Sequence, residues 1–311
     1  MSHGANVTYR YDGSFNGLMT AVYKAISSKK MPENIISEED SQTILFHEEE
    51  VVSDEEISSK MQKYIREKIS FDALDNIRRC YFSNAKEKEM LILKYILLGK
   101  KYGRKVDTML SVDAVITMFK VVKRFSNEAN FYREFLRFTE NDGVLSSVIE
   151  PENFVLPYIV YHYEQRIGNL DFLIYDKTHK VALIHKDKHS DIVFVDDFSL
   201  PEADDKERFY RELWKGYYNI IGIKERYNDK LRMNLMPKKY WKHMTEFEDM
   251  FGSNKENKKS KLHSIRKERG FTQQELSKAS GVSLRMIQLY EQKKNDISKA
   301  QVGYVINLAK V

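Results

Sequence analysis

Cysteine, proline and long apolar runs are scarce in this sequence. Only one cysteine, Cys80, occurs among 311 residues, which excludes an internal disulfide framework and any zinc or iron–sulfur site that needs several thiolates. No apolar run approaches the ~20 residues that span a bilayer, and the first residues lack the basic-then-apolar pattern of a signal peptide. These absences predict a reduced, cytoplasmic protein without a membrane partner.

Signatures of catalysis are scarce as well. The sequence has no glycine-rich phosphate loop, no nucleophile elbow and no zincin helix. Three histidines and two aspartates straddle a predicted hairpin turn, without the i, i+4 spacing that aligns metal ligands on a helix. These residues are His179, His185, His189, Asp187 and Asp191. The polarity of a turn explains them better than a metal does, so we expect no metal and no cofactor, and any catalytic residues are unknown.

The net charge of +5 is unevenly distributed along the chain. From Gly252 onward there are 13 Lys and Arg against 5 Asp and Glu, whereas the preceding residues hold 38 basic and 41 acidic side chains. Because phosphate neutralisation dominates the affinity of proteins for DNA, this asymmetry is typical of a tail that reads DNA. The acidic excess before Gly252 indicates that the larger region has no general DNA-coating surface.

Residues 271–294, FTQQELSKASGVSLRMIQLYEQKK, predict two short helices joined by a sharp turn. Thr272 and Glu275 form a capping box at the start of the first helix, and Leu276 and Ala279 lie on one side of it. Gly281 follows where the chain must turn through the left-handed region. This arrangement predicts a helix-turn-helix, with an αα-hairpin that merely packs as the alternative.

The second helix is expected to start at its cap, Ser283, with Ile287 and Tyr290 on its buried side. The segment resembles the repressor-type helix-turn-helix of phage repressors and their bacterial relatives, through Gln273, Gly281 and Ile287. Ser277 replaces the usual alanine of that family, and a small hydroxyl can still fit between two close helices. The resemblance spans about residues 261–311 and implies a five-helix fold, of which this chain holds about four helices.

The resemblance also implies which residues contact DNA. The groove-facing side of the second helix is predicted to comprise Ser283, Leu284, Arg285, Gln288 and Leu289. By analogy with the repressor family, Leu284, Arg285 and Leu289 face the bases. The fork of Arg285 can pair with guanine O6 and N7, although a contact with phosphate alone remains the alternative. Backbone phosphates are expected to be held by Gln273, Lys293 and Lys294.

The larger region predicts an α+β fold, with helices packed on an antiparallel sheet, followed by the small all-α module. Strands are expected at residues 7–12 and 43–46, and the acidic stretch 38–56 reads as a solvated face or loop. Ser53 and Glu56 form a second capping box. Helices are expected at residues 14–27, 53–68, 71–82, 86–98, 111–125, 127–137, 154–165, 204–226 and up to 236. Hairpin turns at 141–143, 176–179 and 185–190 indicate antiparallel strands.

The domains expected are residues 1–251, with a helical subdomain at about 53–137, a linker at 252–260 and the module at 261–311.

Three segments of this larger region resemble an uncharacterised bacterial family of probable DNA metabolism or repair proteins. They are YDGSFNGLMTAVYKA, VIEPENFVLPYIVYHYEQR and FYRELWKGYYNIIGIKERYNDKLRMNLMPKKYWKHM. The matching residues are Tyr11, Asp12, Gly13, Ser14, Phe15, Glu150, Pro151, Asn153, Leu156, Pro157, Trp214, Glu225, Arg226, Asn228, Met236, Pro237, Tyr240 and Trp241. Members of the family are encoded beside a putative DNA-repair radical-SAM protein, and some are fused to a uracil-DNA-glycosylase-like domain. The resemblance covers residues 7–247 and implies a nucleic-acid context with a radical-SAM partner, but no reaction.

Most of these matching residues fit structural roles, since turns, caps and large buried aromatics account for them. Two groups of charged residues in the same segments are candidates for binding nucleic acid or phosphate. His162 and Arg166 are four apart on one helix and can bind a phosphate. Lys238 and Lys239, which follow Glu225 and Arg226, can hold single-stranded nucleic acid beside aromatic rings. Salt-bridged or solvated surface clusters are the alternative for both.

The sequence therefore predicts a DNA-binding protein of DNA metabolism or repair, in which the tail docks the larger domain on double-stranded DNA. One rival is a transcriptional regulator whose larger domain senses a ligand or partner. The other is an enzyme that acts on DNA bases or ends through the loops at 11–15 and 150–153. A homodimer is left open.

Overall fold

The structure, a computed structural model, describes residues 7–28, 31–38, 47–200, 203–221, 228–247 and 261–291. The chain forms two compact units, residues 1–208 and 209–311, and each is described by itself. The predicted linker at 252–260 lies outside the described residues, and the predicted domain division stays a prediction.

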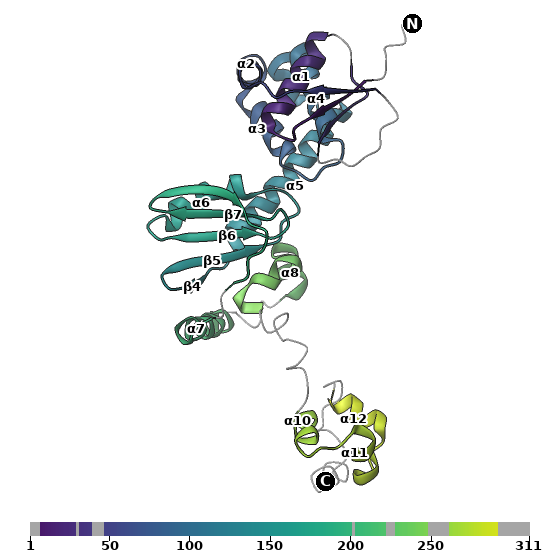
Figure 1. Ribbon diagram of the computed structural model, residues 1–311, viewed down its shortest axis with the longest axis vertical. Helices are drawn as coiled ribbons and strands as arrows, with labels where there is room; N and C mark the ends of the chain where they lie inside the picture. The colour runs from purple at the N-terminus through teal and green to yellow at the C-terminus, as the bar shows by residue number, and fades with distance from the viewer. Residues whose placement is uncertain are drawn as a thin grey trace. The chain divides into compact units, whose positions relative to one another are not determined.

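A three-stranded parallel sheet opens the first unit (Figure 1). β1 (Val7–Tyr11) lies between β2 (Asn34–Ser37) and β3 (His47–Val51), and both neighbours run parallel to it. The prediction of β1 is confirmed, but β2 was missed, and the strand expected at 43–46 falls outside the described residues. Within the acidic stretch 38–56, the three consecutive glutamates of β3 are exposed on an edge strand, so the solvated-face alternative fits them and the loop alternative does not.

Helices pack around this sheet and continue into a helical layer. They are α1 (Phe15–Ser28), α2 (Glu55–Tyr64), a π-helical turn η1 (Ile65–Ile69), α3 (Phe71–Tyr81), α4 (Lys88–Tyr102), a 3-10 turn η2 (Gly103–Thr108) and α5 (Asp113–Phe135). Their apolar faces form one core that includes Leu18, Ile77 and Ile92. Two predictions need correction. The cap of α2 is Asp54 rather than Ser53, since the Asp54 carboxylate accepts from the Ile57 N–H. The two helices expected at 111–137 are a single helix, α5.

The second sheet of the first unit has five strands in the order β4-β5-β6-β7-β8. The strands are β4 (Thr139–Asn141), β5 (Val144–Ile149), β6 (Phe172–Asp176), β7 (Val181–Lys186) and β8 (His189–Phe194). All neighbours are antiparallel except β5 and β6, because α6 (Leu156–Ile167) connects those two as a crossover. The α+β fold is confirmed, with mostly antiparallel pairing in this sheet.

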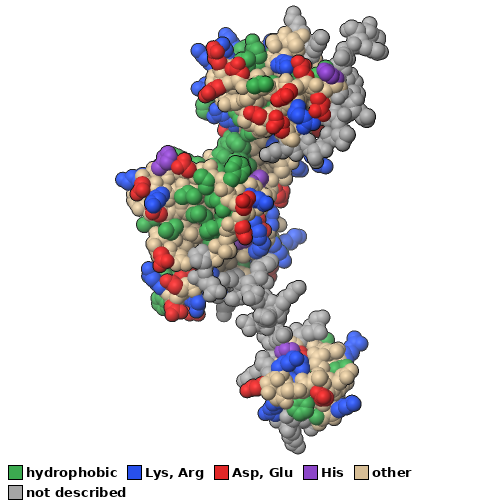
Figure 2. Space-filling model, viewed as in Figure 1, with side chains coloured by type: hydrophobic (Ala, Val, Ile, Leu, Met, Phe, Trp, Pro, Cys, Tyr) green, Lys and Arg blue, Asp and Glu red, His purple; other side chains and the backbone are tan. Residues whose placement is uncertain are grey.

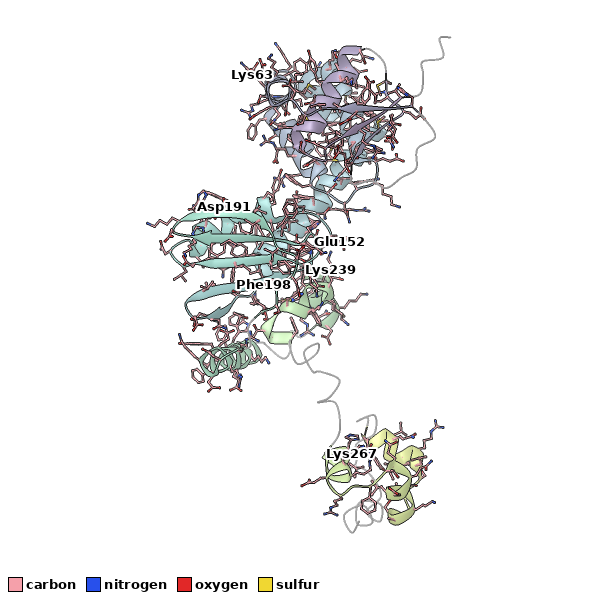
Figure 3. All side chains as sticks on the ribbon, in the orientation of Figure 1. Lys63, Glu152, Asp191, Phe198, Lys239 and Lys267 are labelled. Atoms are coloured by element: carbon pink, nitrogen blue, oxygen red, sulfur yellow. The ribbon has the colours of Figure 1, made fainter. Side chains whose placement is uncertain are left out.

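The two faces of the five-stranded sheet differ. α6 packs against α5 and β7, whereas a small apolar cluster of Val148, Tyr175 and Ala182 is joined by Leu173, Ile184, Val195 and Phe198. Figure 2 shows hydrophobic side chains gathered over these strands, and Figure 3 labels Phe198 beside them.

The described elements from residue 205 to 247 are short apart from one helix. They are α7 (Asp205–Ile221), α8 (Asp229–Leu235) and the 3-10 turns η4 (Lys238–His243) and η5 (Thr245–Phe247). Tyr240 and Trp241, which were expected as buried aromatics, are buried together with Met244 and Phe247. Trp214 on α7 does not fit the expected role of a buried aromatic, because it is 39% exposed. The end of the helix predicted to reach 226 lies outside the described residues.

Candidate nucleic-acid interface

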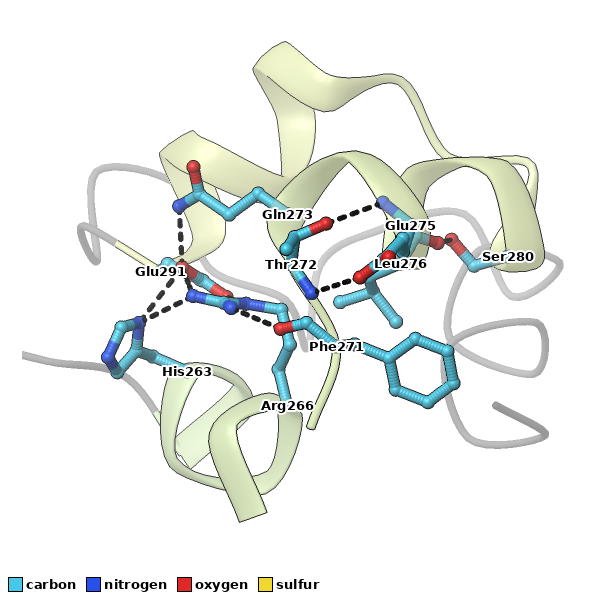
Figure 4. Close-up of polar contacts among 9 residues, drawn as sticks. All are labelled: His263, Arg266, Phe271, Thr272, Gln273, Glu275, Leu276, Ser280 and Glu291. Carbon is cyan, nitrogen blue, oxygen red and sulfur yellow. Dashed lines mark hydrogen bonds and ion pairs between the residues drawn. The ribbon is translucent and has the colours of Figure 1, made fainter. Parts of the chain in front are cut away.

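Within residues 261–291, the part of the C-terminal module that the structure describes, there are three short helices: α10 (Lys261–Glu268), α11 (Gln273–Ser280) and α12 (Leu284–Glu291). The capping box at the start of α11 is confirmed (Figure 4). The Thr272 hydroxyl accepts from the Glu275 N–H at 3.2 Å, and the Glu275 carboxylate accepts from the Thr272 N–H at 2.7 Å. These bonds satisfy two donors that a helix start otherwise leaves unpaired.

The turn between α11 and α12 is set by glycine and serine. Gly281 has a φ of +68° and ends α11 in the left-handed region, as predicted. The Ser277 hydroxyl donates to the Val282 carbonyl at 2.7 Å, so the serine that replaces the usual alanine fits between the helices and ties the turn. Ser283 lies directly before α12, and its hydroxyl accepts from the Met286 N–H at 3.4 Å.

A small core holds the two motif helices together. It consists of Leu276, Val282, Ile287 and Tyr290, against which Leu262, Phe271 and Met286 pack. The buried positions of Ile287 and Tyr290 are therefore confirmed. Ala279 was expected on the buried side of α11 but is exposed, and Ser280 is buried instead. The Ser280 hydroxyl is satisfied by donating to the Leu276 carbonyl at 2.6 Å.

The face of α12 opposite this core carries the side chains predicted to contact DNA. Ser283 and Arg285 are exposed, and Leu284, Gln288 and Leu289 are half-buried. Arg285 forms no ion pair with any residue that the structure describes, so its guanidinium is available to a ligand. Lys293 and Lys294 lie outside the described residues. The geometry of α12 is that of a recognition helix, but which bases it contacts stays a prediction.

A buried ion pair that the sequence did not predict joins α10 to the end of α12 (Figure 4). The Arg266 guanidinium donates from Nε to Glu291 Oε1 at 2.6 Å and from a terminal nitrogen to Oε2 at 3.1 Å. The side chains of both residues are at most 5% exposed. His263 Nδ1 lies 3.0 Å from the same carboxylate, and Arg266 also donates to the Phe271 carbonyl at 2.6 Å. The sequence held one indication that Glu291 is buried, because Glu291 follows Ile287 by one helical turn and so shares its buried face.

The network strongly favours the ionised form of Glu291. Burial by itself raises the pKa of this carboxyl, but hydrogen bonds from Arg266, Gln273 and His263 outweigh burial and lower the pKa to about 2. The pKa of Arg266 is raised by its hydrogen bond to Glu291. The pair is therefore fully charged near neutral pH and fixes the end of α12 against α10.

Gln273 has an internal partner in this network. Its Nε2 donates to Glu291 Oε2 at 2.7 Å, and the side chain is half-buried. The amide nitrogen carries a second hydrogen, so the phosphate contact expected of Gln273 would have to use that hydrogen while the first stays with Glu291. The contact stays a prediction.

In the first unit, the loop before α1 is held by internal bonds. Asp12 Oδ1 accepts from the Ser14 hydroxyl at 2.7 Å, and the Ser14 hydroxyl accepts from the Gly17 N–H at 2.9 Å. A Cβ on Gly17 would lie 2.1 Å from Asp12 Oδ1, which explains the glycine there. The Tyr81 hydroxyl donates to the Gly13 carbonyl at 2.6 Å. The loop is thus part of the packing at the end of α3.

The loop after β5 is latched in the same way. Buried Glu128 on α5 accepts from the Asn153 N–H at 2.9 Å, from the Asn153 side-chain amide at 2.6 Å and from the Glu152 N–H at 3.1 Å. The Asn153 side chain in turn accepts from the Asn84 N–H at 3.0 Å, just beyond α3. Figure 3 labels Glu152 in this loop. Both loops therefore meet the C-terminal end of α3, and these contacts give them structural roles.

The charged candidates in the larger region occupy different settings. His162 is half-buried on α6 and Arg166 is exposed one turn further on. Lys238 and Lys239 are exposed. The ammonium group of Lys238 lies 5.8 Å from the centre of the Trp241 ring, and that of Lys239 lies 5.2 Å from the centre of the Tyr240 ring. Glu225 and Arg226 lie outside the described residues. Contacts of these lysines with nucleic acid stay a prediction.

The histidines near the hairpin turns have local partners. His179 Nδ1 lies 2.6 Å from buried Asp176, and His185 lies 2.8 Å from the Ser190 hydroxyl and stacks on Phe172. No three His, Cys, Asp or Glu side chains gather as a metal site within the part of the chain that the structure describes. No helix among those residues is long and apolar enough to cross a membrane.

The capped helices, the glycine turn and the exposed face of α12 define a helix-turn-helix DNA-binding domain. A helix-turn-helix family model matches residues 262–302. A second family model, described as a domain of unknown function (DUF4130), matches residues 86–246, more than half of the chain. The chain belongs to this DUF4130 family. No curated protein and no solved structure matches it.

Proposed function

We propose that the helix-turn-helix docks the DUF4130 domain on double-stranded DNA and that α12 reads the bases. The observation that carries this proposal is Arg285, which is exposed in the first turn of α12 and has no ion-pair partner among the described residues. Phosphate contacts position a protein on DNA, whereas a guanidinium fork on a base edge selects the sequence. The excess of 13 basic over 5 acidic residues after Phe251 supplies the charge for the phosphate contacts.

A binding-site selection with three proteins tests base reading by Arg285. Arg285→Ala should cost about 1–3 kcal/mol on the selected site and relax the preference at one base pair. Arg285→Lys is the matched control, because it keeps the charge but loses the planar fork. If Arg285 reads guanine, both variants lose the preference. An unchanged preference at every position in both variants would show that Arg285 contacts only phosphate. Two inverted half-sites in the selected sequence would indicate a homodimer.

We propose further that the protein acts in DNA metabolism or repair together with a radical-SAM protein. The support is the resemblance of the three segments to proteins encoded beside such an enzyme. The lone cysteine is also relevant, since an iron–sulfur cluster needs more thiolates than this chain provides and would belong to the partner. Co-expression with the radical-SAM protein that the resemblance predicts beside this gene should give one co-purifying complex. Two separate species on a sizing column would contradict the partnership.

A further inference from the structure

In the first unit α5 packs against α6 (Figure 1), and three basic side chains come from this pair of helices. Arg133 comes from the last turn of α5, and His162 and Arg166 come from α6. A terminal nitrogen of Arg133 donates to the Tyr158 carbonyl, one turn before His162, so the guanidinium lies beside α6. The charges of Arg133 and Arg166 both act on the His162 ring. Sequence spacing predicted only the α6 pair, and the structure adds Arg133 to it.

The positive charge of this cluster is not neutralised within the described structure. Arg133 donates to the Asn130 side-chain oxygen at 3.0 Å and to the Tyr158 carbonyl, both of which are uncharged acceptors. None of Arg133, His162 and Arg166 forms an ion pair with a carboxylate among the described residues. Arginines that only serve packing are usually matched by acids when they are half-buried. This cluster is matched by none.

Two polar atoms of the cluster are buried without a hydrogen-bond partner: His162 Nε2 and Arg133 Nε. A buried polar group without a partner costs about 1–3 kcal/mol, so such groups are uncommon and need an explanation. Both atoms belong to cationic or protonatable side chains. An anion with several oxygens would favour the protonated form of His162, in which Nε2 is a donor, and would offer Arg133 Nε an acceptor.

The titration of His162 reflects the same surplus of positive charge. Burial lowers its pKa most, and the charges of Arg133 and Arg166 lower it further, while only the backbone of Arg133 acts in the opposite direction. Arg133 on α5 and Arg166 on α6 are the charged groups that act on this ring. An anion placed among the three side chains would raise the pKa of His162.

We propose that Arg133, His162 and Arg166 form a binding site for a phosphate group in the DUF4130 domain. A phosphate offers several oxygens, which suit two guanidinium groups and an imidazole better than a single carboxylate does. The phosphate can come from a nucleic-acid backbone or from a free phosphate. The site shares no residue with α12, so this proposal does not depend on base reading by the helix-turn-helix.

The test is a titration of the full-length protein with inorganic phosphate, followed through the imidazole signals of His162 in NMR spectra. The signals are assigned by their absence from His162→Gln. Phosphate should raise the pKa of His162. Arg166→Gln should weaken phosphate binding by about tenfold or more, which corresponds to the loss of one charge-assisted hydrogen bond. Arg166 is exposed, so this substitution should leave the fold intact. Arg104→Gln, which removes another exposed arginine on η2, is the matched control and should change nothing.

A second arm uses a short single-stranded oligonucleotide in place of phosphate and identifies the source of the ligand. Oligonucleotide binding that Arg166→Gln weakens and inorganic phosphate competes away assigns the site to a nucleic-acid backbone. Binding of inorganic phosphate alone, with the same sensitivity to Arg166→Gln, assigns it to a free phosphate. An unchanged His162 pKa with both ligands, or equal affinities for the wild type and Arg166→Gln, would overturn the proposal.

Discussion

At the scale of single residues, we expect the stability of the helix-turn-helix to depend on one buried ion pair. Glu291 and Arg266 bond through both carboxylate oxygens and are almost fully buried. Removing one partner of such a pair leaves a buried charge without compensation, which typically costs 3–5 kcal/mol. Glu291→Gln should therefore unfold much of the module at moderate temperature and abolish DNA binding with it. Exposed Glu268 offers the control, since Glu268→Gln should change the free energy of unfolding by no more than about 0.5 kcal/mol.

Thermal or denaturant unfolding followed by amide hydrogen exchange in α10 to α12 measures this effect separately from the first unit. Equal protection of these helices in Glu291→Gln and in the wild type would show that the pair contributes no net stability. That outcome is physically possible, because desolvation can cancel the attraction between buried charges.

The same pair makes the module sensitive to acid. The folded-state pKa of Glu291 is about 2, below the value near 4.3 of an unfolded glutamate. A lowered folded-state pKa means that the stabilisation is fully present above about pH 4.5 and is lost as the pH falls towards 2. Protection of α10 to α12 should fall over this range in the wild type. It should fall less in Glu291→Gln, and parallel pH profiles for the two proteins would contradict the assignment.

At the scale of elements, the backbone conformation of the turn between α11 and α12 is expected to contribute to the stability of the module. Gly281 has a φ of +68°, and nothing lies within 4 Å of the place a Cβ would take. Gly281→Ala should therefore destabilise the module by about 1–2 kcal/mol through backbone strain alone. Gly216 on α7 also has open space around it but no positive φ. Gly216→Ala should instead stabilise its helix by about 0.5–1 kcal/mol.

Hydrogen exchange of α11 and α12 for Gly281→Ala, and of α7 for Gly216→Ala, measures the two effects. DNA affinity of the folded Gly281→Ala protein should match the wild type, since the turn only positions α12. If both variants raised or both lowered the stability of their helices, local packing rather than φ would decide the effect of an added Cβ.

Elements with local signals were the ones that could be predicted from the sequence. The capping box, the left-handed glycine and the buried spacing of Ile287 and Tyr290 all lie within about 20 residues, so each could be checked against the others. The strand β3 could not be predicted, because its three glutamates are tolerated only at an exposed sheet edge. Edge position is a tertiary property, and propensity alone argues against such a strand.

The contacts that complete the candidate sites could not be predicted for a similar reason. Arg266 and Glu291 are 25 residues apart, and Arg133 reaches α6 from the preceding helix. Neither pairing has a spacing rule, since both depend on how helices pack. The division of α5 into two predicted helices hid the second contact, because a break near residue 126 would have changed the position of Arg133.

At the scale of the whole molecule, charge separates the parts of the chain. The first 251 residues hold 38 basic and 41 acidic side chains, whereas the tail has 13 against 5. Like charges on the larger part and on DNA oppose nonspecific binding, so the tail has to supply the attraction. The phosphate site proposed on α5 and α6 can add a local contact without changing this balance, because it comprises only three side chains.

Truncation after Phe251 tests this division of labour. The shortened protein should lose measurable binding to duplex DNA at moderate salt, because it loses every phosphate contact of the module and has an acidic excess of its own. The intact chain should show a steep fall of affinity with salt, since each released counterion adds about 0.9 to the slope of log K against log salt. A phosphate held by Arg133, His162 and Arg166 would leave, at most, weak binding with a slope near one.

Unchanged hydrogen exchange in α1 to α6 would show that the first unit stays folded without the tail. Equal affinity of the truncated and intact chains for duplex DNA would refute docking by the helix-turn-helix, whereas a lost affinity with a folded first unit places DNA binding in the tail.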